Sequence, residues 1–134
     1  MSRVLVDANV LLDVLTDDPQ WWPWSAEQLD LWTAKAELCI NTIVYAEVSI
    51  GFERIEELDA ALPADTFTRL ELPWEAGFLA GKAFVRYRRA QGSRPSPLPD
   101  FFIGAHAAID GMALLTRDAK RYRTYFPTVE LISP

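Results

Sequence analysis

Residues that bind soft metal ions or form cross-links are scarce in this sequence of 134 residues, which contains one cysteine, Cys39, and one histidine, His106. A single thiol cannot form an internal disulfide, so we expect a buried, unreactive cysteine in a reducing compartment. With one imidazole and one thiol, the chain lacks the ligands of a zinc site or another imidazole-rich metal site.

Long apolar runs are absent as well. No run approaches the ~20 residues that span a bilayer, and the first residues lack the apolar stretch and cleavage site of a signal peptide. We therefore expect a cytoplasmic protein without a membrane partner. Half of the residues are hydrophobic, which suffices for one packed core, and the length predicts a single domain over residues 1–134.

Basic residues are rare in the first part of the chain. Residues 1–75 hold 15 acidic and 4 basic residues, whereas residues 76–134 hold 9 basic and 4 acidic residues. The net charge of −6 argues by itself against a polyanionic partner, but such asymmetry between halves indicates a nucleic-acid surface. A solvated arginine face is the alternative interpretation.

Short apolar runs alternate with helix-like segments along the chain. Strands are expected within residues 3–6, 37–41, 66–72, 113–115 and 129–132, and helices over 10–15, 25–36, 42–52, 54–62, 73–90, 99–110 and 119–125. Ser25 and Gln28 have the spacing of a capping box, and Gly111 is expected to end the helix that starts at Pro99. This alternation predicts an α/β fold, a three-layer α/β/α sandwich around a mostly parallel sheet of about five strands.

Four acidic residues lie at positions where such a sheet binds ligands. Asp7 follows the first expected strand, Glu47 lies in the helix after the second, Asp100 opens a helix and Asp118 follows the fourth strand. Ligands of parallel sheets bind outside the carboxyl ends of the strands, so we expect these side chains to converge. Taken singly, each could equally be a helix cap or a loop acid.

A cluster of four carboxylates requires compensation. Two carboxylates ~4 Å apart repel by roughly 4 kcal/mol at an effective dielectric constant of about 20, so the cluster needs a cation or raised pKa values. Oxygen ligands suit Mg²⁺, with Mn²⁺ as the alternative.

The segments around these acids resemble, in order, the motifs of PIN-domain nucleases, especially VapC-type toxins of bacterial toxin–antitoxin pairs. The segments are residues 4–13, 43–51, 99–107 and 114–122. The resemblance spans essentially the whole chain and implies a PIN-like fold and an endoribonuclease that depends on Mg²⁺ (or Mn²⁺). It implies Asp7, Asp100 and Asp118 as metal ligands, with Glu47 a ligand directly or through water. Asn9 and Thr116 match positions that support the first carboxylate and the water or metal shell.

The resemblance also implies partners: an RNA substrate, a cognate antitoxin protein and a second copy of the chain in a homodimer. We expect basic residues near the acids to contact RNA phosphates, namely Arg86, Arg88, Arg89, Arg94, Arg117 and Lys120. The tryptophans Trp21, Trp22, Trp24 and Trp32 are expected in the core or at an interface. His106 is expected to face away from Asp100, and Asp13 to lie at an exposed helix end.

Two other function classes remain as alternatives. An aspartate-dependent phosphatase has Asp-x-Asp after its first strand, but this chain has Asn9 at the third position. A phosphate-receiver domain would need an acidic pair before its phosphorylated aspartate, and this chain has none before Asp7. A PIN-fold module that binds RNA or protein with little catalysis is the second alternative. Its signature would be an incomplete set of carboxylates, and this set is complete.

Overall fold

The computed structural model describes residues 2–94 and 98–134, and its centre is a parallel sheet. The described strands are β1 (Arg3–Val6), β2 (Glu37–Asn41), β3 (Phe67–Leu70), β4 (Ala113–Leu115) and β5 (Leu131–Ile132). They lie in the order β3-β2-β1-β4-β5, and each pairs with its neighbours in parallel. The predicted α/β fold is confirmed, and the described sheet is parallel throughout.

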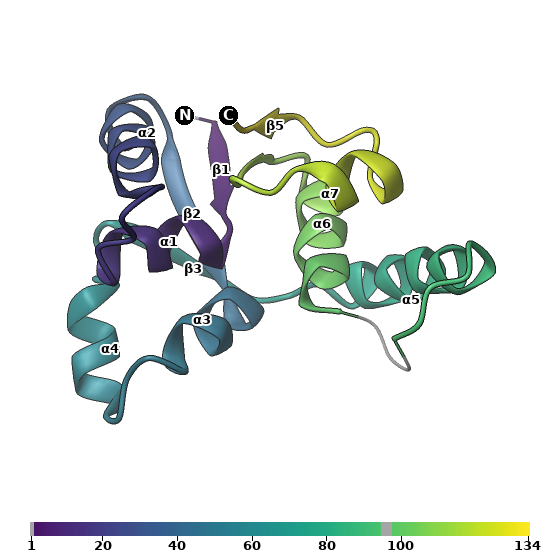
Figure 1. Cartoon of the computed structure of the whole chain (residues 1–134), viewed down its shortest axis with the longest axis horizontal. Helices are drawn as coiled ribbons and strands as arrows, with labels where there is room; N and C mark the ends of the chain where they lie inside the picture. The colour runs from purple at the N-terminus through teal and green to yellow at the C-terminus, as the bar shows by residue number, and fades with distance from the viewer. Residues whose placement is uncertain (1, 95–97) are drawn as a thin grey trace.

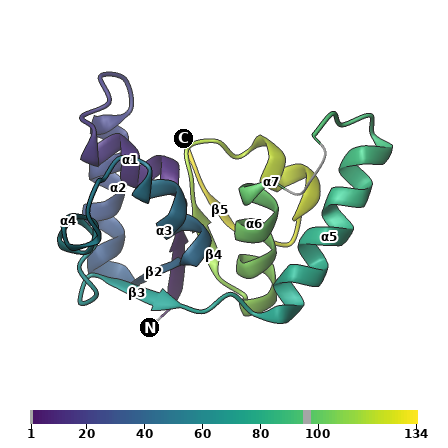
Figure 2. The same cartoon turned by 90° about the horizontal axis from the view of Figure 1, so that it is seen from below.

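Helices cover both sides of the sheet. Figure 2 shows α1, α2 and α4 on one side of the strands and α5, α6 and α7 on the other. Between these layers, α3 contacts both α1 and α6. The bounds are α1 (Ala8–Leu15), α2 (Trp22–Lys35), α3 (Thr42–Ser49), α4 (Ile55–Ala61), α5 (Trp74–Arg89), α6 (Pro99–Asp110) and α7 (Lys120–Tyr125). None of the helices in the described ranges is long and apolar enough to cross a membrane.

The strand order places the functional edge of the sheet. From β1 the chain moves outward to β2 and β3, and it then returns across the sheet to β4 and β5 (Figure 1). The direction therefore changes between β1 and β4, whose carboxyl ends lie side by side. This is the switch point at which open α/β sheets bind ligands.

The core consists of the central strands and the helix faces that cover them. The side chains of β1 from Val4 to Val6 are at most 2% exposed, and Cys39 on β2 is fully buried, as expected. Gly104 of α6 lies against the Phe126 ring so closely that an added Cβ would meet it at 2.4 Å. Gly111 ends α6 in the left-handed conformation, with a φ of 65°, as the sequence predicts.

Two local predictions are wrong. Helix α2 begins at Trp22, with a proline in its first turn, so Ser25 lies inside the helix and is no cap. Its hydroxyl donates instead to the carboxylate of Asp13 at 2.8 Å. Asp13 itself was expected at an exposed helix end, yet it is 2% exposed. The same carboxylate accepts a hydrogen bond from Arg117, which neutralises it.

The tryptophans expected in the core or at an interface differ in their burial. Trp24 and Trp32 pack against the core, whereas Trp22 is 43% exposed. Trp21 lies under the guanidinium of Arg117, whose Cζ is 5.5 Å from the ring centroid.

Candidate active site at the carboxyl ends of the strands

Asp7 occupies the centre of the site because it directly follows β1. It is the N-cap of α1, and its Oδ1 accepts a hydrogen bond from the backbone N–H of Ala8 at 2.8 Å. The side chain is nearly fully buried, with 4% exposure. Burial raises the pKa of Asp7 from 3.8 to about 6, and the charge of Asp100 adds to the rise. Near neutral pH this carboxylate is ionised but poorly solvated.

Two hydroxyl groups hold the other oxygen of Asp7. Thr116 donates to Oδ2 at 2.9 Å from the loop after β4, and Tyr122 donates to it at 2.8 Å from α7. Both hydrogen bonds lower the pKa of Asp7 and so oppose the effect of burial. The amide of Asn9 lies 3.2 Å from the Thr116 hydroxyl and 3.4 Å from Oδ2. Asn9 and Thr116 therefore lie where support for the first carboxylate is expected.

Tyr122 is a site residue that the sequence analysis missed. Its side chain is 1% exposed, and burial together with the nearby carboxylates raises the pKa of its phenol well above 10. The phenol therefore stays protonated and acts as a permanent donor to Asp7. It lies on α7 four residues after Asp118, which is on the preceding loop, and its place within the segment 114–122 is the signal that could have found it.

Glu47 reaches the site from α3. Burial raises its pKa from 4.5 to about 7, and the charges of Asp7 and Asp100 add to this rise. Its Oε1 is the only buried side-chain nitrogen or oxygen within the described residues that lacks a hydrogen-bond partner. Buried polar atoms without partners are rare and destabilising. This oxygen is therefore an acceptor that a further ligand could satisfy.

Asp100 and Asp118 lie in less enclosed positions. Asp100 is in the first turn of α6, and its Oδ2 accepts a hydrogen bond from Arg121 at 2.9 Å. Asp118 is exposed on the loop after β4, and its backbone N–H donates to the Thr116 hydroxyl at 3.1 Å. The structure thus couples Asp7, Glu47 and Asp100 electrostatically and places Asp118 beside them on the loop that supports Asp7.

The carboxylates fit a hard divalent cation by their chemistry. They supply oxygen donors only, one of which is the unpartnered Oε1 of Glu47, and Mg²⁺ and Mn²⁺ prefer such ligands. Across residues 2–94 and 98–134, no three acidic, histidine or cysteine side chains converge closely enough to enclose an ion as they stand. Asp100 is paired with Arg121 at 2.9 Å. An ion would compete with that guanidinium.

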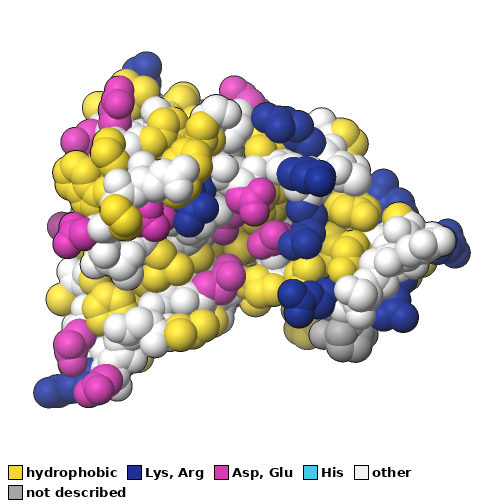
Figure 3. All heavy atoms as spheres, in the orientation of Figure 1, with side chains coloured by type: hydrophobic (Ala, Val, Ile, Leu, Met, Phe, Trp, Pro, Cys, Tyr) yellow, Lys and Arg dark blue, Asp and Glu magenta, His cyan; other side chains and the backbone are white. Residues whose placement is uncertain are grey.

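Basic side chains lie beside the acidic centre. Figure 3 shows acidic side chains near the middle of this face and a column of basic side chains next to them, on the side of α5 to α7. Of the residues expected to contact RNA, Arg89, Arg94 and Lys120 are exposed. Arg86 donates to the carbonyl of Tyr125 and Arg88 to that of Arg94. Both remain exposed at the C-terminal half of α5.

Arg117 has a structural contact that the sequence did not reveal. Its Nε donates to Asp13 at 2.8 Å, and its backbone N–H donates to Asn9 at 3.3 Å. It therefore ties the loop that carries Thr116 to α1. Its side chain is 30% exposed.

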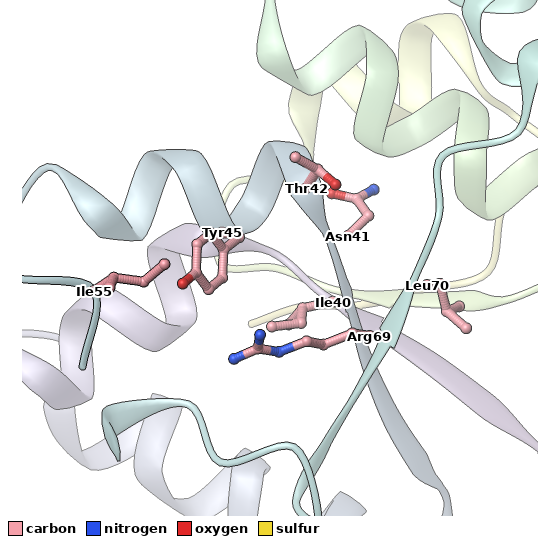
Figure 4. A pocket seen from close by; sticks show the side chains of 7 residues that line it. All are labelled: Ile40, Asn41, Thr42, Tyr45, Ile55, Arg69 and Leu70. Atoms are coloured by element: carbon pink, nitrogen blue, oxygen red, sulfur yellow. The ribbon is translucent and has the colours of Figure 1, made fainter. Parts of the chain in front are cut away.

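A separate hollow lies against α3, β2 and β3, away from the four carboxylates. Figure 4 shows the side chains that line it: Ile40, Asn41, Thr42, Tyr45, Ile55, Arg69 and Leu70. Its volume is about 330 Å³, and none of the four carboxylates lines it. Asp59 accepts hydrogen bonds from Tyr45 at 2.7 Å and from Arg69 at 2.8 Å, so the polar groups of Tyr45 and Arg69 are already paired.

His106 takes no part in the carboxylate cluster. It is fully buried on α6, with one ring nitrogen 3.0 Å from the amide of Asn41 and the other 3.0 Å from the carboxylate of Asp110. The side chain of Asn41 also caps α3, where its Oδ1 accepts a hydrogen bond from the backbone N–H of Val44 at 2.9 Å. His106 thus links α6 to the start of the helix that carries Glu47.

Comparisons with known proteins agree with the fold. Residues 4–127 match the PIN domain. The fold resembles the VapBC2 structure from Rickettsia felis bound to a promoter DNA fragment, with a TM-score of 0.75, 17% identity and 98% of each chain covered. The fold also resembles DNA-bound VapBC from Salmonella typhimurium, with a TM-score of 0.72 and 19% identity. This match covers 99% of this chain and 98% of that chain.

A third solved structure, FitAcB from Neisseria gonorrhoeae, has a TM-score of 0.67 and 18% identity, with 96% of each chain covered. At these identities the likeness concerns the fold. No curated protein matches the sequence significantly.

Proposed function

Because the chain belongs to the PIN domain family, we propose that it is a metal-dependent endoribonuclease, the toxin of a toxin–antitoxin pair. The observation that carries the proposal is the carboxylate cluster at the switch point of the sheet. Burial and mutual repulsion raise the pKa values of Asp7 and Glu47 to about 6 and about 7. Glu47 also keeps an unpartnered buried oxygen. Such a cluster is unfavourable without a cation.

We assign the metal-binding role to Asp7, Glu47, Asp100 and Asp118. A bound Mg²⁺ or Mn²⁺ would supply a nucleophilic hydroxide and charge neutralisation at the phosphodiester. Asp7 is fixed for this role by its hydrogen bonds from Thr116 and Tyr122. Glu47, whose pKa of about 7 leaves it partly protonated near neutral pH in the free protein, would release its proton as the site becomes occupied.

Basic residues beside the carboxylates would orient the RNA. Lys120 and Arg121 lie beside Asp118 and Asp100, and they can bind the phosphates that flank the cleaved bond. The buried walls formed by Tyr122 and Thr116 keep bulk water away from Asp7.

The test is cleavage of a labelled RNA by the purified chain with Mg²⁺, with Mn²⁺ and with EDTA. We expect cleavage with either ion and none with EDTA, and at least a hundredfold loss in Asp7→Asn and Asp100→Asn. Glu53→Gln, at an exposed glutamate, is the matched control. Cleavage by Asp7→Asn in EDTA would contradict the proposal. A folded wild-type chain that binds RNA without cutting it would favour the weakly catalytic binding module.

Protein partners are part of the same proposal. Helix α5 exposes Trp74 (93%) and Phe78 (70%), while Ile50 (86%) and Ile55 (62%) are exposed around the turn between α3 and α4. Trp74 and Phe78 are one helical turn apart, and adjacent exposed apolar side chains are typical of protein interfaces. We propose that an antitoxin and a second copy of the chain cover these surfaces. Light scattering of the chain alone and of the chain co-expressed with its neighbouring open reading frame would test both partners.

A further inference from the structure

A groove beside the acidic cluster has the composition of a nucleotide-binding site. It is lined by Tyr87, Asp118, Lys120, Arg121, Thr124 and Tyr125 and has a volume of about 430 Å³. We propose that this groove, the tyrosine groove, binds one unpaired nucleotide of single-stranded RNA next to the cleaved phosphate. Its base would stack on a tyrosine ring, and its phosphate would pair with Lys120 and Arg121. This inference rests on the proposed function and specifies how that site holds its substrate.

The two tyrosines form a preorganised aromatic wall. Tyr87 comes from α5 and Tyr125 from α7, and their ring centroids are 6.3 Å apart. Behind them, the Phe101 ring lies 5.5 Å from Tyr87 and 5.4 Å from Tyr125, which fixes both rings in place. Both tyrosines are only partly buried. Stacking of a base on such a ring contributes ~1–3 kcal/mol and tolerates any base.

Cations surround the same wall. Lys120 is exposed at the groove, and the guanidinium carbon of Arg121 lies 6.0 Å from the Tyr87 ring centroid. Arg86 lies over the other tyrosine, with its guanidinium carbon 5.7 Å from the Tyr125 ring centroid. Aromatic rings interleaved with basic side chains are typical of proteins that bind single-stranded nucleic acid.

The groove is joined to the acidic cluster at two points. Asp118 lines it, and Arg121 bridges it to Asp100 through the 2.9 Å ion pair. A nucleotide in the groove therefore places its phosphate next to the carboxylates. Its volume lies in the ~300–1,000 Å³ range of small-molecule sites, which admits a nucleotide but no duplex. A base reaches a ring face only when it is unstacked, so the site selects single-stranded RNA.

The first test measures binding by fluorescence anisotropy, with a 5′-fluorescein-labelled oligo(U) RNA in EDTA so that cleavage does not interfere. We expect Tyr125→Leu and Tyr87→Leu each to weaken binding about tenfold. Lys120→Ala should also weaken it and reduce the dependence on salt. Tyr45→Leu is the matched control, because this partly buried tyrosine lines the separate hollow behind α3. Equal binding by Tyr125→Leu, Tyr87→Leu and the control would overturn the proposal.

The second test needs no substitution and so does not depend on how the variants fold. Oligo(U) RNA containing 5-iodouridine is cross-linked by light to the wild-type chain, and the modified peptides are mapped by mass spectrometry. We expect adducts on Tyr87 or Tyr125. Adducts confined to other residues would refute the groove as the base site and point to another RNA path.

Cleavage of the same RNA with Mg²⁺ separates the two proposals. A chain that cleaves RNA but carries its adducts elsewhere retains the nuclease function and loses the tyrosine groove. A chain that cross-links at the groove yet cleaves nothing retains the binding site and loses the nuclease function. A chain that fails to bind oligo(U) and fails to cleave it contradicts both, and the groove would then suit an acidic segment of a protein partner.

Discussion

Glu47→Gln should stabilise the metal-free protein at alkaline pH and leave it unchanged at acidic pH. Folding raises the pKa of Glu47 from 4.5 to about 7. Between these values the folded state therefore binds more protons than the unfolded chain, and the free energy of unfolding must fall as the pH rises. Glutamine resembles the protonated glutamate and removes this dependence.

The size of this gain in the free energy of unfolding follows from the pKa shift of Glu47. A change in pKa from 4.5 to about 7 corresponds to an upper limit of about 3.5 kcal/mol, at about 1.4 kcal/mol per pKa unit. Because Glu47 is only partly buried, solvent screening reduces this to about 1–2 kcal/mol. We therefore expect a gain of about 1–2 kcal/mol at pH values well above 7, and none near pH 4.5.

The assay is urea denaturation in EDTA, followed by circular dichroism, at one pH near 4.5 and one above 8. Glu53→Gln is the control, since it removes one exposed negative charge from the same region. Saturating Mg²⁺ should remove the advantage of the variant, because it stabilises the wild-type cluster more. An equal gain at both pH values, or a loss at the higher one, would refute the view that an unpaired buried carboxylate destabilises the free site.

Three further substitutions test the surroundings of the cluster. Tyr122→Phe removes a donor to Asp7, so it should destabilise the fold by ~1–3 kcal/mol and raise the pH at which cleavage is half-maximal. Arg117→Ala leaves the buried carboxylate of Asp13 without its cation and should reduce the free energy of unfolding by about 3 kcal/mol, a loss that RNA contact alone would not produce. Gly104→Ala forces a methyl group into an aromatic ring at 2.4 Å, and urea denaturation should show a loss of ~1–3 kcal/mol.

Each of these substitutions has a counterpart elsewhere in the chain. Tyr45→Phe removes a phenol that is not in the cluster, and its effect on the pH profile of cleavage should be nil. Arg54→Ala breaks an exposed ion pair with Glu56 and should change stability by at most ~1 kcal/mol. Gly77 lies within helix α5, and a Cβ added there meets nothing within 4 Å. Gly77→Ala should therefore stabilise the fold by up to ~1 kcal/mol. Effects as large as those of the test substitutions would contradict the assigned contacts.

The sequence predicted the sheet well because its signals are local. The strands β1 and β4 have the predicted bounds, since each is a short apolar run that is followed by a polar residue, Asp7 or Thr116. Asp7 could be placed at the functional edge for the same reason, as it is the first residue after β1. The start of α2 could not be predicted, because Ser25 has the local pattern of a cap while its hydroxyl is engaged by Asp13 from another helix.

The contacts that define the site are distant in sequence. The donors to Asp7 from Thr116 and Tyr122 lie 109 and 115 residues away, and the partner of Asp13 lies 104 residues away. No periodicity or motif spacing contains such a pairing, because it depends on β1 and β4 becoming neighbours in the sheet. The acids near the carboxyl ends of the strands could thus be named as candidates from the sequence, whereas their burial and their hydrogen-bond partners required the fold.

The basic residues in the second half of the chain have partners in the fold that the sequence does not reveal. Counted along the sequence, its arginines indicate a surface for phosphates. In the fold, Arg117 neutralises the buried Asp13 and Arg121 pairs with Asp100. Two of these positive charges therefore compensate one acidic residue in each half of the chain. An RNA phosphate near Arg121 must compete with Asp100, whereas Lys120 is exposed and meets no such competition. Removal of Lys120 should therefore weaken RNA binding at every metal concentration, while removal of Arg121 should weaken RNA binding and, by freeing Asp100, strengthen Mg²⁺ binding.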